Sequence, residues 1–172
     1  MNKYSLFKAI FVFLVLMFSV FTRAEEKGVT VEEEEMTIKG LGFDPQAQTP
    51  VVLLSDKENK KVLPIWIGLC EARSIELGLS GEVAPRPLTY DMFAAIVRAM
   101  KGKVERIVIV DLRDQVFYAQ IEVSLNGSVS KVDARPSDAI ALASRMGAPI
   151  FVKKSVLERA APPETEGEKR GT

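Results

Sequence analysis

Residues 133–138, which read Asp-Ala-Arg-Pro-Ser-Asp, hold the densest set of reactive side chains in the sequence. The residues before them alternate as in a strand, where side chains two positions apart point the same way, so Asp133 and Arg135 are expected on one face. A helix is predicted to follow, and its first backbone N–H groups would lie beside Ser137 and Asp138. Such a junction can bind a phosphate through Arg135 and the helix end, or a hard cation through the carboxylates. In the structural alternative, Arg135 pairs with Asp133 or Asp138, and Ser137 or Asp138 caps the helix.

The sequence contains no histidine and a single cysteine, Cys70. This composition excludes His-based general acid/base pairs, serine or cysteine nucleophiles activated by His, and nearly all zinc sites. Cys70 ends the apolar run 65–70 and is predicted to be a packed thiol without a catalytic role. Chemistry must therefore rely on carboxylates, hydroxyl groups, Lys and Arg, or a bound metal ion.

Three polar residues outside residues 133–138 are further candidates for a site. Glu71 is expected on the polar stripe of a helix. Arg86 lies in a rigid Pro-Arg-Pro connector that can present its guanidinium to a phosphate. Asn126-Gly127 predicts a two-residue hairpin turn, and counting back from that turn places Gln120 opposite Asp133.

The elements that must position these residues predict an α+β fold with one domain. The continuous β-branched run 107–110 indicates a central strand covered on both faces. With the two strands around Asn126-Gly127 it is expected to form an antiparallel meander in a mixed, twisted sheet with three to four helices. Strands are expected at residues 36–43, 50–54, 61–67, 107–110, 116–125, 128–134 and 149–152. Helices are expected from residue 69, from an N-cap at Thr89 to a stop at Gly102, from Pro136 to a stop at Gly147, and over 155–160.

The two ends of the chain predict segments outside this domain. Residues 1–24 have the layout of a secretory signal peptide, with two lysines, an apolar stretch shorter than the roughly 18 residues of a membrane span, and a small residue at the end. Cleavage after Ala24 would make the membrane contact transient and the mature protein periplasmic or secreted, and a retained anchor is the alternative. Residues 25–35 are predicted to be a charged linker or the lead-in to an edge strand, 36–160 the folded domain and 161–172 a disordered tail.

Five motifs in this domain resemble the bifunctional nuclease (BFN) domain family over residues 36–159. They are residues 49–54 (TPVVLL), 63–68 (LPIWIG) with Glu71, 86–91 (RPLTYD), Asp114 with 117–119 (FYA), and 133–143 (DARPSDAIALA). The resemblance implies a compact α+β domain that self-associates and has nuclease activity on DNA and RNA. It marks as motif positions Glu71, Asp91, Asp114, Asp133, Arg135, Ser137 and Asp138. Family members commonly have His where this chain has Tyr90, so a mechanism that uses that His would be absent.

We therefore predict a nuclease that hydrolyses phosphodiester bonds of DNA and RNA with Mg²⁺ or Mn²⁺ as cofactor. Asp133, Asp138 and Glu71 are the predicted metal ligands. Asp133, Asp138 and Arg135 are the predicted catalytic residues, and Arg135 would stabilise the charge that develops on the phosphate.

Substrate binding is assigned to Ser137, Arg86 and Gln120. The charge balance is unfavourable for this function, because 23 Lys and Arg face 23 Asp and Glu and the predicted signal peptide holds three of the basic residues. A mildly acidic mature chain lacks the long-range attraction that a polyanion favours. The alternative is a non-catalytic oligomeric binding module of the cell envelope, in which residues 133–138 form only a capped helix start.

Overall fold

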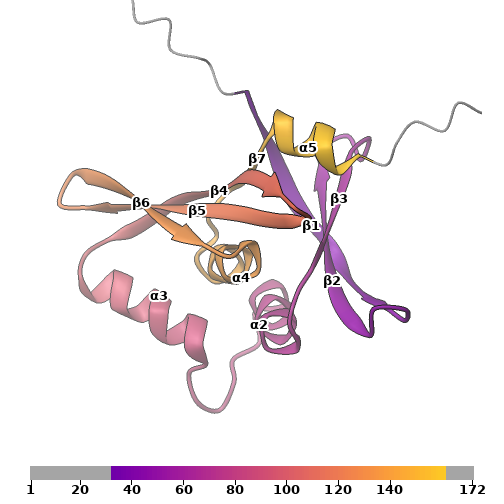
Figure 1. Ribbon diagram of the computed structural model, residues 1–172. Coiled ribbons are helices and arrows are strands. Elements are labelled where there is room, and N and C mark those ends of the chain that lie inside the picture. The colour runs from indigo at the N-terminus through magenta and orange to yellow at the C-terminus, as the bar shows by residue number, and fades with distance from the viewer. Residues whose placement is uncertain (1–31, 162–172) are drawn as a thin grey trace, which may run out of the picture. The chain divides into compact units, whose positions relative to one another are not determined.

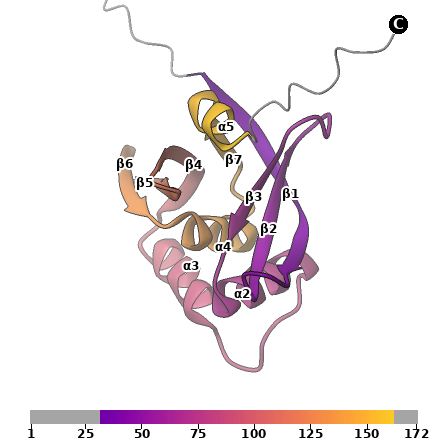
Figure 2. The same cartoon turned by 45° about the vertical axis from the view of Figure 1, so that its right-hand side comes forward.

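A seven-stranded sheet lies at the centre of the computed structural model, which describes residues 32–161. Its strand order is β3-β2-β1-β7-β4-β5-β6 (Figure 1). The strands are β1 (Glu33–Asp44), β2 (Thr49–Asp56), β3 (Val62–Trp66), β4 (Lys103–Arg113), β5 (Val116–Leu125), β6 (Ser128–Ala134) and β7 (Ile150–Lys153). Neighbouring strands are antiparallel except β4 and β7, which are parallel. The predicted mixed sheet is confirmed. The sheet is twisted, so that β1–β3 run in a different direction from β4–β6 in Figures 1 and 2.

The predicted meander is formed by β4, β5 and β6. Asn126 and Gly127 both have positive φ angles, of 51° and 82°, as a two-residue turn between twisted strands requires. This turn sets the register in which Leu125 pairs with Ser128 and Gln120 pairs with Asp133. The hairpin register expected from the sequence is therefore confirmed.

Four helices accompany the sheet: α2 (Leu69–Ser80), α3 (Thr89–Ala99), α4 (Pro136–Met146) and α5 (Lys154–Ala160). Figure 1 shows α4 on one side of β4 and β5 and α5 on the other. Ile107, Val108 and Ile109 of β4 are all buried, because both faces of this strand are covered. The prediction of a central strand at residues 107–110 is thus confirmed.

Helices α2 and α4 pack closely and run in the same direction. Near their beginnings, Glu71 of α2 accepts a hydrogen bond from Arg135, the residue before α4. Near their ends, Gly78 of α2 lies against Ser144 of α4, and a Cβ atom on Gly78 would be 2.3 Å from the Ser144 hydroxyl oxygen. The glycine permits this close crossing, which gathers the N-terminal ends of the two helices at one place and their C-terminal ends at another.

The structure corrects the boundary between the predicted linker and the domain. Strand β1 begins at Glu33, so residues 33–35 belong to the sheet and pair with β7. The charged run is accommodated because each of its glutamates has a basic partner. The pairs are Glu32 with Lys154, Glu33 with Arg106, Glu34 with Lys61 and Glu35 with Lys57.

Two local predictions were also wrong. Helix α3 begins at Thr89 with Leu88 as the N-cap residue, and the Asp91 carboxylate accepts a hydrogen bond from the Leu88 N–H in place of a Thr89 cap. Cys70 is exposed, because the apolar strand pattern ends at Gly68 and Cys70 lies in the first turn of α2, on its solvent side.

The predicted signal peptide at residues 1–24, the first part of the linker and nearly all of the predicted tail at 161–172 lie outside the described residues. Among residues 32–161, no helix has the length and apolar character required to span a membrane.

Candidate active site

The junction between β6 and α4 positions the groups predicted to do chemistry. Strand β6 ends at Ala134, which pairs with Ala119 and packs against the core. Arg135 follows as the N-cap residue of α4 in an extended conformation, and Pro136 begins the helix. Proline suits this position because its missing N–H would have no helical partner there. The sequence thus turns the backbone at Arg135 and sends its side chain toward the helices.

Arg135 binds two carboxylates at once. Its Nε and Nη2 donate to Oδ2 and Oδ1 of Asp138 at 2.6 Å and 2.8 Å, and Nη2 also donates to Oε1 of Glu71 at 2.8 Å. The bidentate contact with Asp138 is the strong geometry for a guanidinium and a carboxylate. Both carboxylates, Asp138 first, raise the pKa of Arg135 above its ordinary value. The Arg135 side chain is nevertheless 68% exposed, so it can be reached from solvent.

Asp138 also accepts a hydrogen bond of 2.5 Å from the Tyr90 hydroxyl. Partial burial acts to raise the pKa of Asp138, but the hydrogen bonds from Arg135 and Tyr90 outweigh it and leave that pKa below its ordinary value. Burial and the contact with Asp138 raise the pKa of Tyr90. At neutral pH the pair is therefore an ionised carboxylate and a protonated phenol.

Glu71 reaches this cluster because Gly68 leaves room for it. Gly68 is the N-cap residue of α2, and a Cβ atom there would lie 2.3 Å from Oε2 of Glu71. The Glu71 side chain is only 14% exposed and folds back over the start of its own helix. Gly68, which ends the strand pattern in the sequence, is thus also the residue whose missing side chain leaves space for the Glu71 carboxylate.

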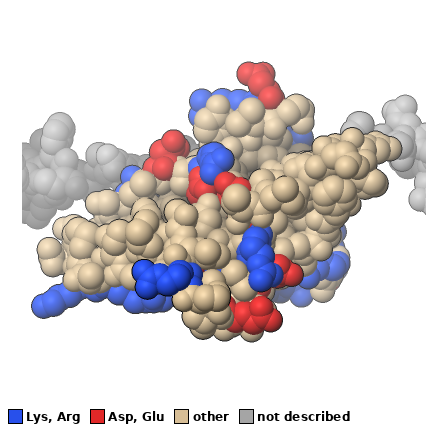
Figure 3. Space-filling model, turned by 90° about the horizontal axis from the view of Figure 1, so that it is seen from below, with Lys and Arg blue, Asp and Glu red and all other residues tan. Residues whose placement is uncertain are grey.

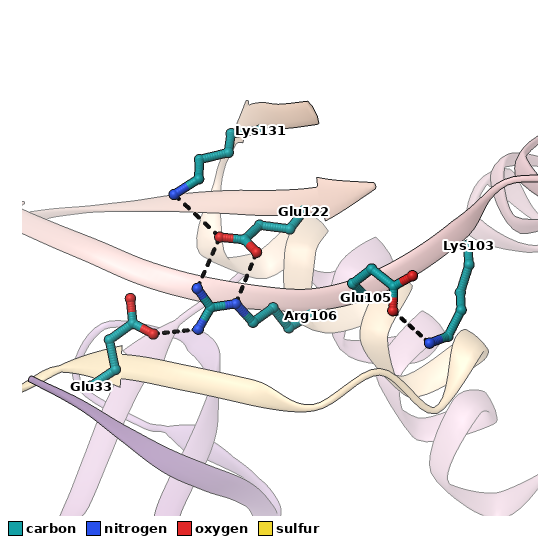
Figure 4. Close-up of polar contacts among 6 residues, drawn as sticks. All are labelled: Glu33, Lys103, Glu105, Arg106, Glu122 and Lys131. Carbon is teal, nitrogen blue, oxygen red and sulfur yellow. Dashed lines mark hydrogen bonds and ion pairs between the residues drawn. The ribbon is translucent and has the colours of Figure 1, made fainter. Parts of the chain in front are cut away.

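Asp133 does not join Arg135, Asp138 and Glu71. It lies opposite Gln120 on the sheet face that also carries Lys131, two residues earlier in β6. Lys131 contacts Glu122, which belongs to a charged cluster with Arg106 on that face (Figure 4).

The expectation that Asp133 and Arg135 share a face was therefore wrong. The strand ends at Ala134, one residue before Arg135, and the start of α4 directs the arginine away from the face of Asp133. Gln120 is separated from the Arg135 cluster for the same reason, since it faces Asp133. Of the three predicted metal ligands, the structure brings together Glu71 and Asp138 only.

The two remaining predicted substrate ligands differ in their surroundings. Ser137 is buried in the first turn of α4 and lines a cleft beside Arg135. Arg86 lies exposed in the loop between α2 and α3, and within residues 32–161 its side chain has no hydrogen bond or ion pair. Ser137 is thus part of the candidate site, whereas no contact connects Arg86 to it.

The cleft next to Arg135 has a volume of 560 Å³. The end of β3, the turn before β5 and the start of α4 enclose it. Its aromatic lining consists of Trp66, which is 51% exposed and donates from its indole N–H to Asp44, and the half-buried Phe117. Aromatic rings of this kind are surfaces on which nucleic-acid bases stack.

Sequence reasoning missed Tyr90, Trp66 and Phe117 as members of the site. Tyr90 was noted only as the residue that replaces a usual histidine. Trp66 and Phe117 could have been found from their place in two of the family motifs, residues 63–68 and 117–119. The hydrophobic pattern of the sequence does not indicate that β3 and β5 meet at one cleft.

The donor set for a metal ion is small. Within the part of the chain that the structure describes, no group of three or more His, Cys, Asp or Glu side chains is placed to hold a metal. Glu71 and Asp138 offer two carboxylates next to each other, both bonded to Arg135. Two carboxylates fit Mg²⁺, which is often held by one or two protein carboxylates while water and substrate phosphates supply the other ligands.

Comparisons with known proteins identify the family of the chain. The uncharacterized proteins Rv1829 and MT1877 of Mycobacterium tuberculosis, from strains H37Rv and CDC 1551, are each 39% identical over 126 residues, which cover 73% of this chain and 75% of theirs. A family model described as the bifunctional nuclease domain matches residues 52–165. This stretch includes Glu71, Arg135 and Asp138 and every residue that lines the cleft except Thr49. The chain therefore belongs to the bifunctional nuclease domain family.

Proposed function

We propose that this protein is a nuclease that hydrolyses phosphodiester bonds of DNA and RNA in the cleft beside Arg135. The observation that carries the proposal is the position of Arg135, which lines a cleft with Ser137 and Trp66 and is held by two carboxylates on its other side. Membership of the bifunctional nuclease domain family supports the same function.

The start of α4 and Arg135 provide the groups that would bind a phosphate. The first backbone N–H groups of a helix attract anions, and a guanidinium matches the geometry of phosphate oxygens. Because Arg135 is exposed, an incoming phosphate can compete with Asp138 and Glu71 for its N–H groups. Arg135 would then stabilise the negative charge that builds up on the phosphate during bond cleavage.

Asp138 and Glu71 become available when Arg135 turns to the phosphate. The lowered pKa keeps Asp138 ionised at neutral pH, which suits a metal ligand and not a general acid. We propose Mg²⁺ or Mn²⁺ as the ion that these two residues would hold. Such an ion polarises a phosphate oxygen and lowers the pKa of bound water.

A cleavage assay tests the proposal with the protein purified from cells, so that its natural N-terminus is kept. Labelled single-stranded DNA and RNA are incubated with Mg²⁺, Mn²⁺ or a chelator. We expect Arg135→Gln to lower the cleavage rate about 10²- to 10³-fold, the usual cost of one group that stabilises transition-state charge. We expect Glu71→Gln and Asp138→Asn to weaken the response to metal. Glu76→Gln lies on the same helix and is the matched control, because among residues 32–161 the Glu76 carboxylate pairs only with exposed Arg73.

Three results would redirect the proposal. Cleavage that survives both the chelator and these variants indicates a contaminant or another site. Loss of cleavage in Asp133→Asn would indicate that the active site lies on the face of β6 that carries Asp133, and not beside Arg135. Absence of cleavage with any metal favours the alternative, a non-catalytic binding module in which the charged cluster only fixes the start of α4.

Binding can be measured apart from cleavage because Trp66 is the single tryptophan of the chain. We expect a single-stranded oligonucleotide to quench its fluorescence, with a midpoint that rises steeply with salt concentration. Arg135→Gln should shift this midpoint to higher oligonucleotide concentration. Unchanged fluorescence at saturating oligonucleotide would place the nucleic acid elsewhere.

Two further proposals concern the setting of the protein. We propose export through residues 1–24 with cleavage after Ala24, which predicts a periplasmic or secreted protein whose N-terminal residue is Glu25. Sequencing of the N-terminus after cell fractionation tests this directly. A retained segment would show Met1 or a membrane-bound fraction.

We also propose self-association, supported by an apolar stripe on α3. Met92, Phe93, Ile96 and Met100 recur at helical spacing and are each about half exposed. Figure 3, which views the molecule from below Figure 1, shows a surface of mostly uncharged residues with separate basic and acidic groups. Light scattering during size-exclusion chromatography measures the mass, and Phe93→Glu should lower it to that of one chain.

A further inference from the structure

A second pocket lies at the C-terminal ends of α2 and α4, at the opposite end of these helices from Arg135. It has a volume of 210 Å³. Its polar lining comes from the loop after α2, the first and last turns of α3 and the last turn of α4. The residues that matter for its chemistry are Glu82, Asp91, Arg98, Ser144 and Arg145.

Arg145 is the unusual residue of this pocket. Its side chain is nine-tenths buried, with 10% exposed, and its Nη1 lies 3.1 Å from Oδ1 of Asp91. Nε and Nη2 are both buried and have no hydrogen-bond partner among the described residues. Unpaired buried donors on a charged group are costly, and a partner that accepted from both would remove that cost.

The unpaired edge identifies the chemistry of such a partner. The same edge of Arg135, formed by Nε and Nη2, holds the two oxygens of Asp138 in a bidentate contact. A guanidinium edge of this kind matches the paired oxygens of a carboxylate or a phosphate. The ligand expected at Arg145 is therefore an oxyanion.

The acid already present cannot fill this role. Asp91 uses Oδ1 for Nη1 of Arg145 and Oδ2 for the backbone N–H of Leu88, so both of its oxygens are engaged. Arg98 adds a second, exposed cation to the lining, and exposed Glu82 adds an anion. An oxyanion would bind between the two arginines and would be opposed by Glu82.

Because Nε and Nη2 of Arg145 are buried, an oxyanion that reached them would have to displace part of the pocket lining, and the loop between α2 and α3 supplies Glu82 and Val83 to that lining. Glu82 and Val83 begin this loop, and Val83 is 93% exposed, so few contacts hold it in place. The hydrogen bond from the Glu82 N–H to the Ser80 hydroxyl, at 3.3 Å, tethers the loop at its start.

We propose that Arg145 and Arg98 form a binding site for a small oxyanion, a phosphate or carboxylate group carried by a small molecule. The volume is below the roughly 300–1,000 Å³ of pockets for drug-sized ligands, which favours a single anionic group with a short attachment. This site is separate from the cleft beside Arg135, and its test needs no nuclease activity.

Calorimetric titration of the full-length chain with inorganic phosphate and, separately, with acetate tests the proposal at constant ionic strength. We expect saturable binding of at least one probe, and the comparison decides between phosphate and carboxylate. Arg145→Lys keeps the charge but loses the bidentate edge, so it should weaken binding about tenfold. Arg73→Gln removes an exposed arginine elsewhere on α2 and should leave binding unchanged.

Two further measurements keep the test decisive. Glu82→Gln should tighten binding, because it removes the opposing anion and leaves the fold intact. In spectra of arginine Nε–H groups, the Arg145 signal, assigned by its loss in Arg145→Lys, should shift with the same midpoint as the heat of binding. Absence of saturable binding by both probes, or binding that is equal in Arg145→Lys, would overturn the proposal.

Discussion

Tyr90 and Asp138, 48 positions apart in the sequence, are joined by a hydrogen bond of 2.5 Å from the phenol to the carboxylate. Tyr90 belongs to the first turn of α3 and Asp138 to the first turn of α4. The next residue of α3, Asp91, contacts Arg145 two helical turns further along α4. The start of α3 therefore touches both the candidate active site and the proposed anion pocket.

Replacement of Tyr90 by phenylalanine should lower the free energy of unfolding by about 1 to 2 kcal/mol, because a carboxylate loses a hydrogen bond in a partly buried site. The pKa of Asp138 should rise, since one of the two groups that lower it is removed. Urea denaturation measures the first effect and carboxyl NMR signals measure the second. Tyr118→Phe is the control, because the Tyr118 hydroxyl has no hydrogen bond among residues 32–161 and its ring lies under Arg113.

The lowered pKa of Asp138 also predicts a dependence of stability on pH. A carboxyl group whose pKa is lower in the folded state stabilises the fold above its unfolded-state value, here about 3.8, and loses this effect as the pH falls through the folded-state pKa. The difference in unfolding free energy between the unmodified chain and Asp138→Asn should thus be constant near pH 7 and shrink below about pH 4. Urea titrations from pH 7 to acid pH measure it. A difference that stayed constant at acid pH would show that the pKa of Asp138 is the same in the folded and unfolded states.

Sequence patterns predicted most of the fold because its signals are local. Asn126-Gly127 set a hairpin register that the structure reproduces residue by residue, and the β-branched run 107–110 identified the strand covered on both faces. The first strand was predicted to begin at Met36 instead of Glu33, because the interactions that place the glutamates before Met36 in the sheet are not local. The basic partners of these glutamates lie in other elements, up to Lys154, and no local pattern shows that a charged strand will be neutralised there.

The candidate site was predicted in part. Arg135, Ser137 and Asp138 are adjacent in sequence, and the proline between them correctly indicated a helix start. Asp133 was misplaced because the strand alternation stops at Ala134, and the start of α4 at Pro136 turns the chain so that Arg135 reaches the helices. Tyr90 and Trp66 reach the site only through the packing of α3 and β3, which periodicity does not encode.

Gly68→Ala tests whether Glu71 holds Arg135 in place. The new methyl group would meet the end of the flexible Glu71 side chain, so we expect a loss of less than about 1 kcal/mol in stability but a displaced carboxylate. The proposed cleavage and its response to metal should then fall as in Glu71→Gln. Gly40→Ala is the control, since a Cβ atom there meets nothing within 4 Å. Full activity in Gly68→Ala would remove Glu71 from the site.

Gly78→Ala should destabilise the fold through the crossing of α2 and α4. A Cβ atom at Gly78 would lie 2.3 Å from the Ser144 hydroxyl oxygen and 3.0 Å from the Ser144 backbone carbon, so the two helices must separate. Overpacking of this kind costs about 1 to 3 kcal/mol. The hydroxyl is the nearest obstacle, so Ser144→Ala should recover part of the loss when combined with Gly78→Ala, whereas the contacts with the Ser144 Cβ at 2.8 Å and the backbone carbon leave the remainder. Urea denaturation of the two single variants and the double variant measures the coupling, and strictly additive effects would show that the two residues do not limit the approach of the helices.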